Sequence, residues 1–203
     1  MDLILITAVS RPENLELVGA SIARAHAEVP AVSLVWWLAF GVKVEMMEAA
    51  RERWARLDVG AAQLRFSYTH VAGTVGGPER NLALDMIPED AGTMVAFLDD
   101  DTTLDPSYLA RLDTLTAEHP GQAIVVDQVD RDGNLRCAAT PQCMHPCSVD
   151  TGMGIFPREL IGEMRFDGDC YESDGRLFQA IYERNPGRCT FVSEPLSIYN
   201  ALQ

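Results

Sequence analysis

Three consecutive carboxylates follow a short apolar run near the middle of the chain. The run spans residues 95–98, and the acids are Asp99, Asp100 and Asp101. Such a run is typical of a strand buried on both faces of a sheet, and ligand sites in open α/β sheets lie beyond the carboxyl ends of these strands. Adjacent acids repel one another unless a positive charge lies among them, and Mg²⁺ and Mn²⁺ prefer oxygen ligands. The pattern therefore indicates either a divalent-metal site or a solvated turn in which Asp105 caps the next helix.

Strands and helices alternate through the first half of the chain. Apolar or alternating runs predict strands at residues 3–8, 33–38, 63–69 and 94–98. Helical spacing and capping signals predict helices that begin near Ser10, span 45–57, and begin near Gly76 and Asp105. This alternation predicts a parallel sheet wound with helices, which would place the acidic triplet at one edge of the sheet.

The order of elements changes after residue 123. Strands are predicted at 123–129 and 135–138, and the turn-forming residues between them favour a hairpin. The remaining elements are a loop at 141–150, helices at 157–164 and 173–184, and a strand at 189–192. Because there is no repeat, low-complexity segment or linker, we expect a single domain.

Composition limits the classes of function. The chain has 203 residues, 47% of them hydrophobic, which is typical of a globular domain. Its formal charge of −14 disfavours non-specific binding of nucleic acid or anionic membranes. The longest apolar stretch, 31–42, is too short to span a bilayer as a helix, and no secretory signal is visible. Five cysteines without a regular framework favour a reducing compartment, so we expect a cytoplasmic protein.

Five short segments together carry a family resemblance. They are residues 7–15 after the first strand, 78–84 (Pro-Glu-Arg-Asn-Leu-Ala-Leu), 97–101 with the acidic triplet, 151–158 (Thr-Gly-Met-Gly-Ile-Phe-Pro-Arg) and 172–174 (Glu-Ser-Asp). In this order they resemble the opening loop, the "ARN-L-L" helix, the "DxD" motif, the "G-x-x-x-F-x-R" strand and the "ED" motif of GT-A nucleotide-sugar glycosyltransferases, especially family 2. Each motif is weak alone, but five in order are fairly specific.

The resemblance implies an α/β fold of the GT-A (Rossmann-like) type. Its mostly parallel central sheet would be flanked by helices and extended by a smaller mixed C-terminal portion. The single domain, 1–203, would comprise a nucleotide-binding half, 1–104, and an acceptor-side half, 105–203. The implied activity is metal-dependent transfer of a sugar from a nucleotide-diphosphate donor, of UDP or GDP type, to an unidentified acceptor hydroxyl. The expected outcome at the sugar carbon is inversion.

The resemblance also assigns roles on the donor side. Asp101 would hold Mn²⁺ or Mg²⁺, and Asp99 would contact the ribose, a metal-bound water or the metal itself. The full set expected to bind the nucleotide sugar is Thr7, Val9, Arg11, Arg80, Asp99 and Asp100. A salt bridge to the acidic cluster is an equally good interpretation of Arg80.

On the acceptor side, the resemblance makes Asp174 the general base. It would take a proton from the acceptor hydroxyl as that hydroxyl attacks C1, with no covalent intermediate. Glu172 is the alternative base, and a purely structural acid at a helix N-terminus is the alternative interpretation of Asp174. Few residues follow Tyr199, where many relatives are longer, so a partner subunit such as a second copy of the chain is one way to complete the acceptor site.

One departure from the family leaves the donor base open. Family 2 enzymes usually end the second strand with an acid that reads the base, whereas this chain has no acid there until Glu45. Trp36 or Trp37 could stack on a base, although a core position is the simpler interpretation for both.

Two other functions compete with glycosyl transfer. Residues 99–103 also match the "DxDxT" motif of haloacid-dehalogenase-like phosphatases, with Asp99 as nucleophile and Asp101 as acid/base. That family needs a downstream lysine, and Lys43 is the only lysine. A catalytically inactive GT-A protein that only binds is the second alternative.

A group of soft ligands lies in the predicted loop. Cys137, Cys143, His145 and Cys147 invite a zinc interpretation, but they lack the paired C-x2-C spacing of structural zinc sites. We therefore expect buried thiols in a loop.

Overall fold

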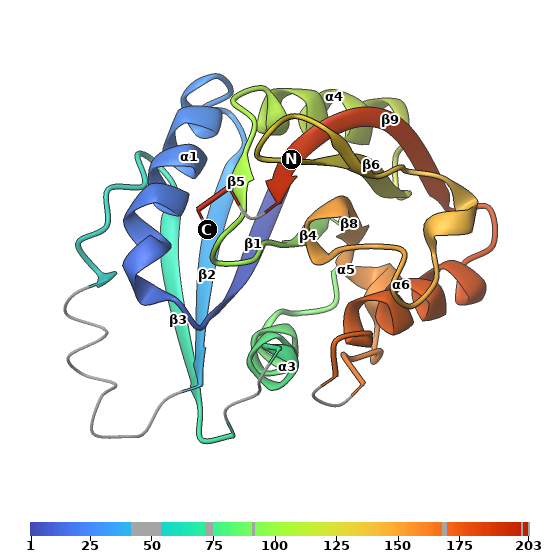
Figure 1. Ribbon diagram of the computed structural model, residues 1–203, viewed down its shortest axis with the longest axis horizontal. Coiled ribbons are helices and arrows are strands. Elements are labelled where there is room, and N and C mark those ends of the chain that lie inside the picture. Colours follow the sequence, from blue (N-terminus) through green and yellow to red (C-terminus); the bar gives the residue numbers. More distant parts are fainter. Residues whose placement is uncertain (42–53, 72–74, 91, 168–169, 200, 203) are drawn as a thin grey trace.

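The fold is taken from a computed structural model, which describes residues 1–203 except 42–53, 72–74, 91, 168–169, 200 and 203. In the described part, nine strands form one sheet in the order β3-β2-β1-β4-β8-β6-β9-β5, with β7 paired to β6 (Figure 1). The sheet curls, and helices cover both of its faces. Most of the predicted helix at 45–57 lies outside the described residues.

The first half of the chain supplies the parallel part of the sheet. It consists of β1 (Asp2–Val9), β2 (Ser33–Gly41), β3 (Gln63–Thr69) and β4 (Thr93–Phe97). Leu5 pairs with Trp36 on one side and with Ala96 on the other. Strands β1, β2 and β4 form because their apolar runs are buried from both sides, whereas β3 is the edge strand and is only partly buried. Their carboxyl ends lie along one edge of the sheet, and the acidic triplet directly follows β4.

Two separate apolar cores flank the sheet. One lies under η1 (Pro12–Asn14), α1 (Leu15–Ala27) and α4 (Tyr108–Glu118), where Leu15, Ile22 and Leu112 are fully buried. The other lies under α3 (Gly77–Met86), α5 (Arg158–Ile161) and α6 (Ser173–Arg184), which Figure 1 shows on the opposite face. Burial on both faces is what a parallel α/β sheet requires.

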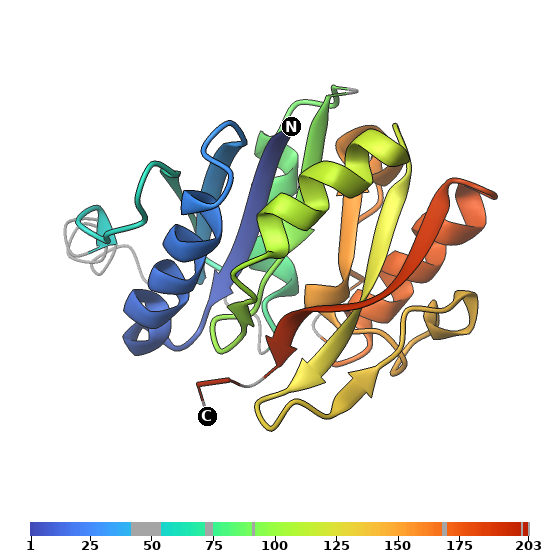
Figure 2. The same ribbon diagram turned by 90° about the horizontal axis from the view of Figure 1, so that it is seen from above.

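The second half adds mixed strands to the sheet. They are β5 (Thr103–Leu104), β6 (Ala123–Asp130), β7 (Leu135–Cys137), β8 (Gly154–Pro157) and β9 (Cys189–Tyr199), with short turns η2 (Pro141–Cys143) and η3 (Thr151–Met153) between them. Strand β8 runs antiparallel between β4 and β6. Figure 2 shows the long β9 beside β6, to which it is parallel.

Most predicted elements are present, with three corrections in the second half. The predicted helix at 157–164 is the much shorter α5, because Pro157 still belongs to β8 and Gly162 ends the helix at φ 51°. The predicted strand at 189–192 continues to Tyr199. The two-residue β5 was not predicted, since only its pairing with β9 makes it a strand. Within the described residues, no helix combines the length and apolar character needed to cross a bilayer.

Candidate active site

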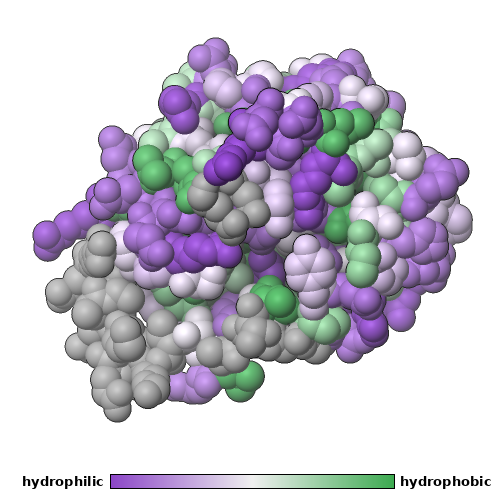
Figure 3. Space-filling model, viewed as in Figure 1, coloured by the Kyte–Doolittle hydropathy of each residue, from purple (hydrophilic) through white to green (hydrophobic). Residues whose placement is uncertain are grey.

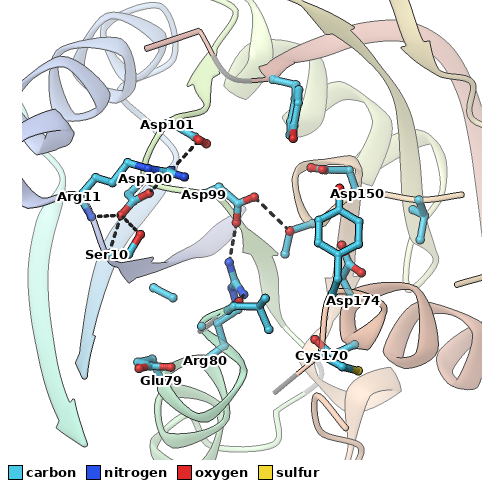
Figure 4. A pocket seen from close by; sticks show the side chains of 18 of the residues that line it. Ser10, Arg11, Glu79, Arg80, Asp99, Asp100, Asp101, Asp150, Cys170 and Asp174 are labelled. Carbon is cyan, nitrogen blue, oxygen red and sulfur yellow. Dashed lines mark hydrogen bonds and ion pairs between the residues drawn. The ribbon is translucent and has the colours of Figure 1, made fainter. Parts of the chain in front are cut away.

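An open cavity of about 260 Å³ lies at the carboxyl ends of β1 and β4. Its wall comes from the loop after β1, the start of α3, the acidic triplet, β7, η3, the start of α6 and the end of β9. Hydrophilic side chains dominate this face of the molecule (Figure 3). Figure 4 shows that Asp99 and Asp101, from the segment after β4, lie around the same cavity as Asp150 and Asp174, which come from two other segments. The topology thus unites the acids of both predicted halves.

Asp100, at the end of β4, is hydrogen-bonded to the loop after β1. Its carboxylate accepts hydrogen bonds from the backbone N–H groups of Ser10 and Arg11, both at 2.5 Å, and from the Ser10 hydroxyl at 2.9 Å. The residue is 2% exposed. A buried carboxylate needs such donors to stay charged. Asp100 therefore shapes the wall of the cavity through the loop that carries Val9 and Arg11.

Arg11 bridges the last two acids of the triplet. Its Nη1 lies 3.0 Å from Oδ1 of Asp100 and 2.6 Å from Oδ2 of Asp101. The acids are buried, whereas the Arg11 side chain is 42% exposed. A metal ion that uses Asp101 would share or replace this contact.

Asp99 forms an ion pair with Arg80, with 2.5 Å between Oδ1 and Nη2. Arg80 also donates to the Val75 carbonyl at 2.7 Å, and the Thr151 hydroxyl lies 3.4 Å from the other Asp99 oxygen. Burial, together with the charges of Asp150 and other nearby acids, raises the pKa of Asp99 to about 7 against the opposing effect of Arg80. The salt bridge considered for Arg80 is present, and the same guanidinium lines the cavity.

Gly76 permits the close approach that places Arg80. It precedes α3 with φ 76°, a conformation that favours glycine. A Cβ atom at this position would lie 2.5 Å from the Ala8 Cβ and 3.0 Å from Nη1 of Arg80. The start of α3 can therefore pack against the end of β1 only if this residue is glycine.

Asp174 lies in the first turn of α6 and faces the cavity. Burial raises its pKa to about 6, although the Gly175 N–H donates to Oδ1 at 2.7 Å and favours the charged form. A Cβ on Gly175 would lie 2.6 Å from the Cα of Pro146. The loop before η3 therefore packs directly on the turn that carries Asp174. A carboxylate that titrates near pH 6 is suited to accept a proton at neutral pH.

Two predicted site residues lie away from the cavity. Glu172 contacts Arg176 at 3.2 Å and the Cys147 thiol at 3.5 Å, and its side chain is 43% exposed. Thr7 is fully buried, and its hydroxyl accepts a hydrogen bond from Trp36 Nε1 at 3.0 Å. Trp37 is also in the core, where its Nε1 donates to Ser67. Neither tryptophan is placed to stack on a base.

Several wall residues were not predicted from the sequence. They are Arg136, Asp150, Tyr171, Tyr199 and the cysteines 137, 147 and 170. Asp150 carried one usable signal, since it directly precedes the glycine-containing segment 151–158. Its side chain caps η3 by accepting from the Gly152 N–H at 3.1 Å. The others come from elements whose pairing the sequence did not reveal.

The carboxylates of the cavity could hold a divalent cation if a bound phosphate group supplied further oxygen ligands. Among the described residues, no group of three or more His, Cys, Asp or Glu side chains is arranged to enclose a metal ion, so a cysteine–histidine zinc site is also not formed there. Mg²⁺, however, is usually held by one or two carboxylates together with substrate phosphates. In the described part of the cavity, acids outnumber arginines two to one; the acids are Glu79, Asp99, Asp100, Asp101, Asp150 and Asp174, and the arginines Arg11, Arg80 and Arg136. An anionic diphosphate would need a cation to enter such a site.

Solved glycosyltransferase structures resemble this one over almost its whole length. TarS from S. aureus in complex with UDP-GlcNAc superposes with a TM-score of 0.70 at 16% identity, over 98% of this chain and 58% of that chain. The mannosyltransferase PcManGT from Pyrobaculum calidifontis, in complex with GDP-Man and Mn²⁺, gives a TM-score of 0.67 at 14% identity, over 98% and 56%. The chain thus spans a little under three fifths of each.

No protein-family profile and no curated protein sequence matches the chain. At identities of this size, the structural likeness establishes the fold and leaves the reaction to be argued from the site. The curled sheet, its flanking helices and the superposition together show that this chain has the GT-A fold, as its five sequence motifs predicted.

Proposed function

We propose that this protein is a metal-dependent glycosyltransferase. It would move a sugar from a nucleotide-diphosphate donor of UDP or GDP type to an acceptor hydroxyl, with inversion at the sugar carbon. The observation that carries the proposal is the placement of Asp174, with its pKa near 6, in the same cavity as the acidic triplet. The GT-A fold and the nucleotide sugars bound in TarS and PcManGT support the donor class.

The proposed reaction is a single displacement. Asp174 takes the proton of the acceptor hydroxyl as its oxygen forms a bond to C1 of the sugar. The bond between C1 and the diphosphate oxygen breaks on the opposite face, so the configuration inverts. Val9 and the backbone that Asp100 holds would line the nucleotide, while Arg11 and Arg80 supply fixed positive charge near the phosphates.

We propose Asp101, with Asp99 nearby, as the residues that would hold Mn²⁺ or Mg²⁺. The acid excess of the cavity supports a cation, and PcManGT was solved with Mn²⁺. Such an ion would neutralise the negative charge that develops on the departing diphosphate. Asp101 would then share or exchange its contact with Arg11, which also contacts Asp100.

The phosphatase alternative has less support. Its nucleophile would be Asp99, but that carboxylate is paired with Arg80, and the only lysine lies far upstream at position 43. The GT-A fold also favours nucleotide-sugar chemistry over the phosphatase motif. A GT-A protein that binds a nucleotide sugar without turnover is the second candidate, because the fold and the cavity would serve binding as well as transfer.

A cytoplasmic location is part of the same proposal. All five cysteines, Cys137, Cys143, Cys147, Cys170 and Cys189, are free thiols. Free thiols persist in a reducing compartment.

The decisive experiment is a thermal-shift screen with UDP, GDP, dTDP and CDP, each with and without Mn²⁺, followed by donor hydrolysis with the matching nucleotide sugars. Ligands that bind the native state raise its apparent stability. A shift with one nucleotide only when Mn²⁺ is present, together with release of free sugar, would support the proposal and identify the base. A shift without any turnover would favour the binding protein.

A further inference from the structure

Arg136, on β7, is a fixed arginine on the acceptor side of the cavity. Its Nη1 donates to Gln128 Oε1 at 2.6 Å and to Asp150 Oδ2 at 2.9 Å. Its guanidinium carbon lies 3.6 Å from the centre of the Tyr199 ring, so one flat face is covered. Gln128 and Asp150 are buried, which holds the guanidinium in one orientation.

One edge of this guanidinium has no partner among the described residues. Every hydrogen bond that Arg136 makes there uses Nη1, which leaves Nε and Nη2 unpaired. Neither atom is among the enclosed polar atoms without a partner, so both are accessible. In Arg111 the same two atoms bind a carboxylate: Nε and Nη2 donate to the two Glu194 oxygens at 2.7 and 2.9 Å. Arg136 thus lines the cavity and has an unused pair of parallel donors.

The surroundings of this edge are aromatic and acidic. Tyr171 and Tyr199 both interact electrostatically with Arg136, and the Tyr171 side chain is highly exposed at the cavity rim. Asp150 already balances the charge of Arg136, and it also raises the pKa of nearby Asp174, though less than burial does. The corner thus offers two N–H donors, two carboxylates and an exposed ring, with an excess of negative charge.

We propose that this corner is the acceptor subsite, and that it takes a neutral, polyhydroxylated ring: a carbohydrate without a carboxylate or phosphate group. Hydroxyl oxygens of the acceptor accept from Nε and Nη2 of Arg136, and its hydroxyl hydrogens are donated to Asp150 and Asp174. The C–H face of the sugar ring packs on Tyr171. The inference rests on the proposed glycosyl transfer and adds the acceptor class to it.

Charge decides between neutral and anionic acceptors. An anion on the free edge of Arg136 would lie close to Asp150 and Asp174, and no uncompensated positive charge remains in this corner among the described residues. Buried or half-buried like charges are strongly unfavourable. A hydroxyl group carries no such cost and satisfies the same donors.

The test uses the full chain with the donor identified above and pairs of p-nitrophenyl glycosides that differ only by a carboxylate. The pairs are glucoside with glucuronide and galactoside with galacturonide. We expect transfer to at least one neutral glycoside, with kcat/KM at least about tenfold above that of its uronide partner. Preference for a uronide would overturn the inference. Donor hydrolysis without transfer to either neutral glycoside would overturn it as well.

Variants identify the residues responsible. Arg136→Lys keeps the charge but loses the paired donors, so the acceptor KM should rise about tenfold with a smaller change in kcat. Arg111→Lys loses the same donor pair outside the cavity and should match the wild type. Tyr171→Ala changes an exposed residue and should raise the acceptor KM several-fold, whereas Tyr171→Phe should restore it. An unchanged acceptor KM in Arg136→Lys and Tyr171→Ala would refute the subsite.

Failure of the inference differs from failure of the proposed function. If the donor is hydrolysed but these variants do not alter the acceptor KM, only the acceptor subsite is wrong. If no nucleotide binds and no donor is hydrolysed, glycosyl transfer is wrong and the subsite falls with it.

Discussion

Asp100 and Asp174, on opposite sides of the cavity, are held in opposite ways. On the donor side, Asp100 accepts two backbone N–H groups and a hydroxyl, and Arg11 contacts both Asp100 and Asp101. On the acceptor side, Asp174 accepts one hydrogen bond from the described residues, the N–H of Gly175. Asp100 and Asp101 each have hydrogen-bond or ion-pair donors around them. Asp174 is partly buried, and among the described residues no arginine forms an ion pair with it.

This difference separates acids that set geometry from an acid that can exchange a proton. Several donors around a carboxylate stabilise its charged form and fix its position. Burial with few donors does the reverse, and it raises the pKa of Asp174 to about 6. The comparison therefore predicts that the two sides respond differently when their charges are removed.

The largest effect is expected at Asp174. Asp174→Asn should lower the transfer rate by about 10²–10⁴-fold, because a general base contributes about that much. Nucleotide affinity in the presence of Mn²⁺, measured by calorimetry, should change by less than about twofold. Glu172→Gln makes the same chemical change outside the cavity and is the matched control. A near-normal rate for Asp174→Asn with a large loss for Glu172→Gln would transfer the role to Glu172.

The pH profile is the next test. A base must be deprotonated to act, so kcat should fall about tenfold per pH unit below about 6 and reach a plateau above about 7.

The free energy of unfolding should change with pH in the opposite direction to kcat. Between pH 3.8 and about 6 the folded protein retains a proton at Asp174 that the unfolded chain has lost, so the free energy of unfolding falls as pH rises through this window. Chemical denaturation of the wild type and of Asp174→Asn across that range measures how the free energy of unfolding changes with pH. A steeper fall with pH in the variant than in the wild type would contradict the prediction.

Asp101 tests the donor side. Asp101→Asn should weaken Mn²⁺-dependent nucleotide binding at least about tenfold, a loss of about 1.4 kcal/mol. Calorimetry with and without Mn²⁺ measures the difference. Asp132→Asn, an exposed acid in the hairpin turn, is the control for total charge. Equal Mn²⁺ dependence in the Asp101 variant and the control would exclude Asp101 as a metal ligand.

Asp100 should affect stability more than chemistry. Asp100→Asn replaces the charge-assisted hydrogen bonds from a buried carboxylate to the loop after β1 with weaker ones, which should cost about 2 kcal/mol. For a chain of this size the thermal midpoint should fall by about 4–8 °C. Asp132→Asn again serves as the control and should leave the midpoint within about 1 °C. An unchanged midpoint for the Asp100 variant would show that the loop does not depend on this carboxylate.

Apolar periodicity was enough to predict the parallel half of the sheet. Strand β3 has the predicted bounds, and β1, β2 and β4 differ from theirs by a few residues at the ends. The full length of β9 was missed because residues 193–195, Ser-Glu-Pro, interrupt its apolar pattern. The register with β6 shifts beside Asp127, which accommodates that interruption. Irregular pairing of this kind leaves no local sequence signal.

Site residues could be predicted from the sequence where a short local motif contains them. The acidic triplet and Asp174 were found from motifs, and both lie in the cavity. Thr7 was expected there too, but it lies on the same face of β1 as Leu3 and Leu5, beneath α1. Arg136 and Tyr199 come together only because β7 and β9 both pair with β6, a long-range arrangement that no short window contains.

Under the proposed function, the contact between Gly175 and Pro146 limits how acceptor choice can evolve in this scaffold. The two backbones meet so closely that the acceptor-side loop and the turn bearing Asp174 cannot move independently. A transplanted loop of different length would displace the turn that carries Asp174 along with the specificity it was meant to change. Point substitutions that keep the backbone of residues 145–147 are therefore the accessible route to new acceptors, in nature or in the laboratory.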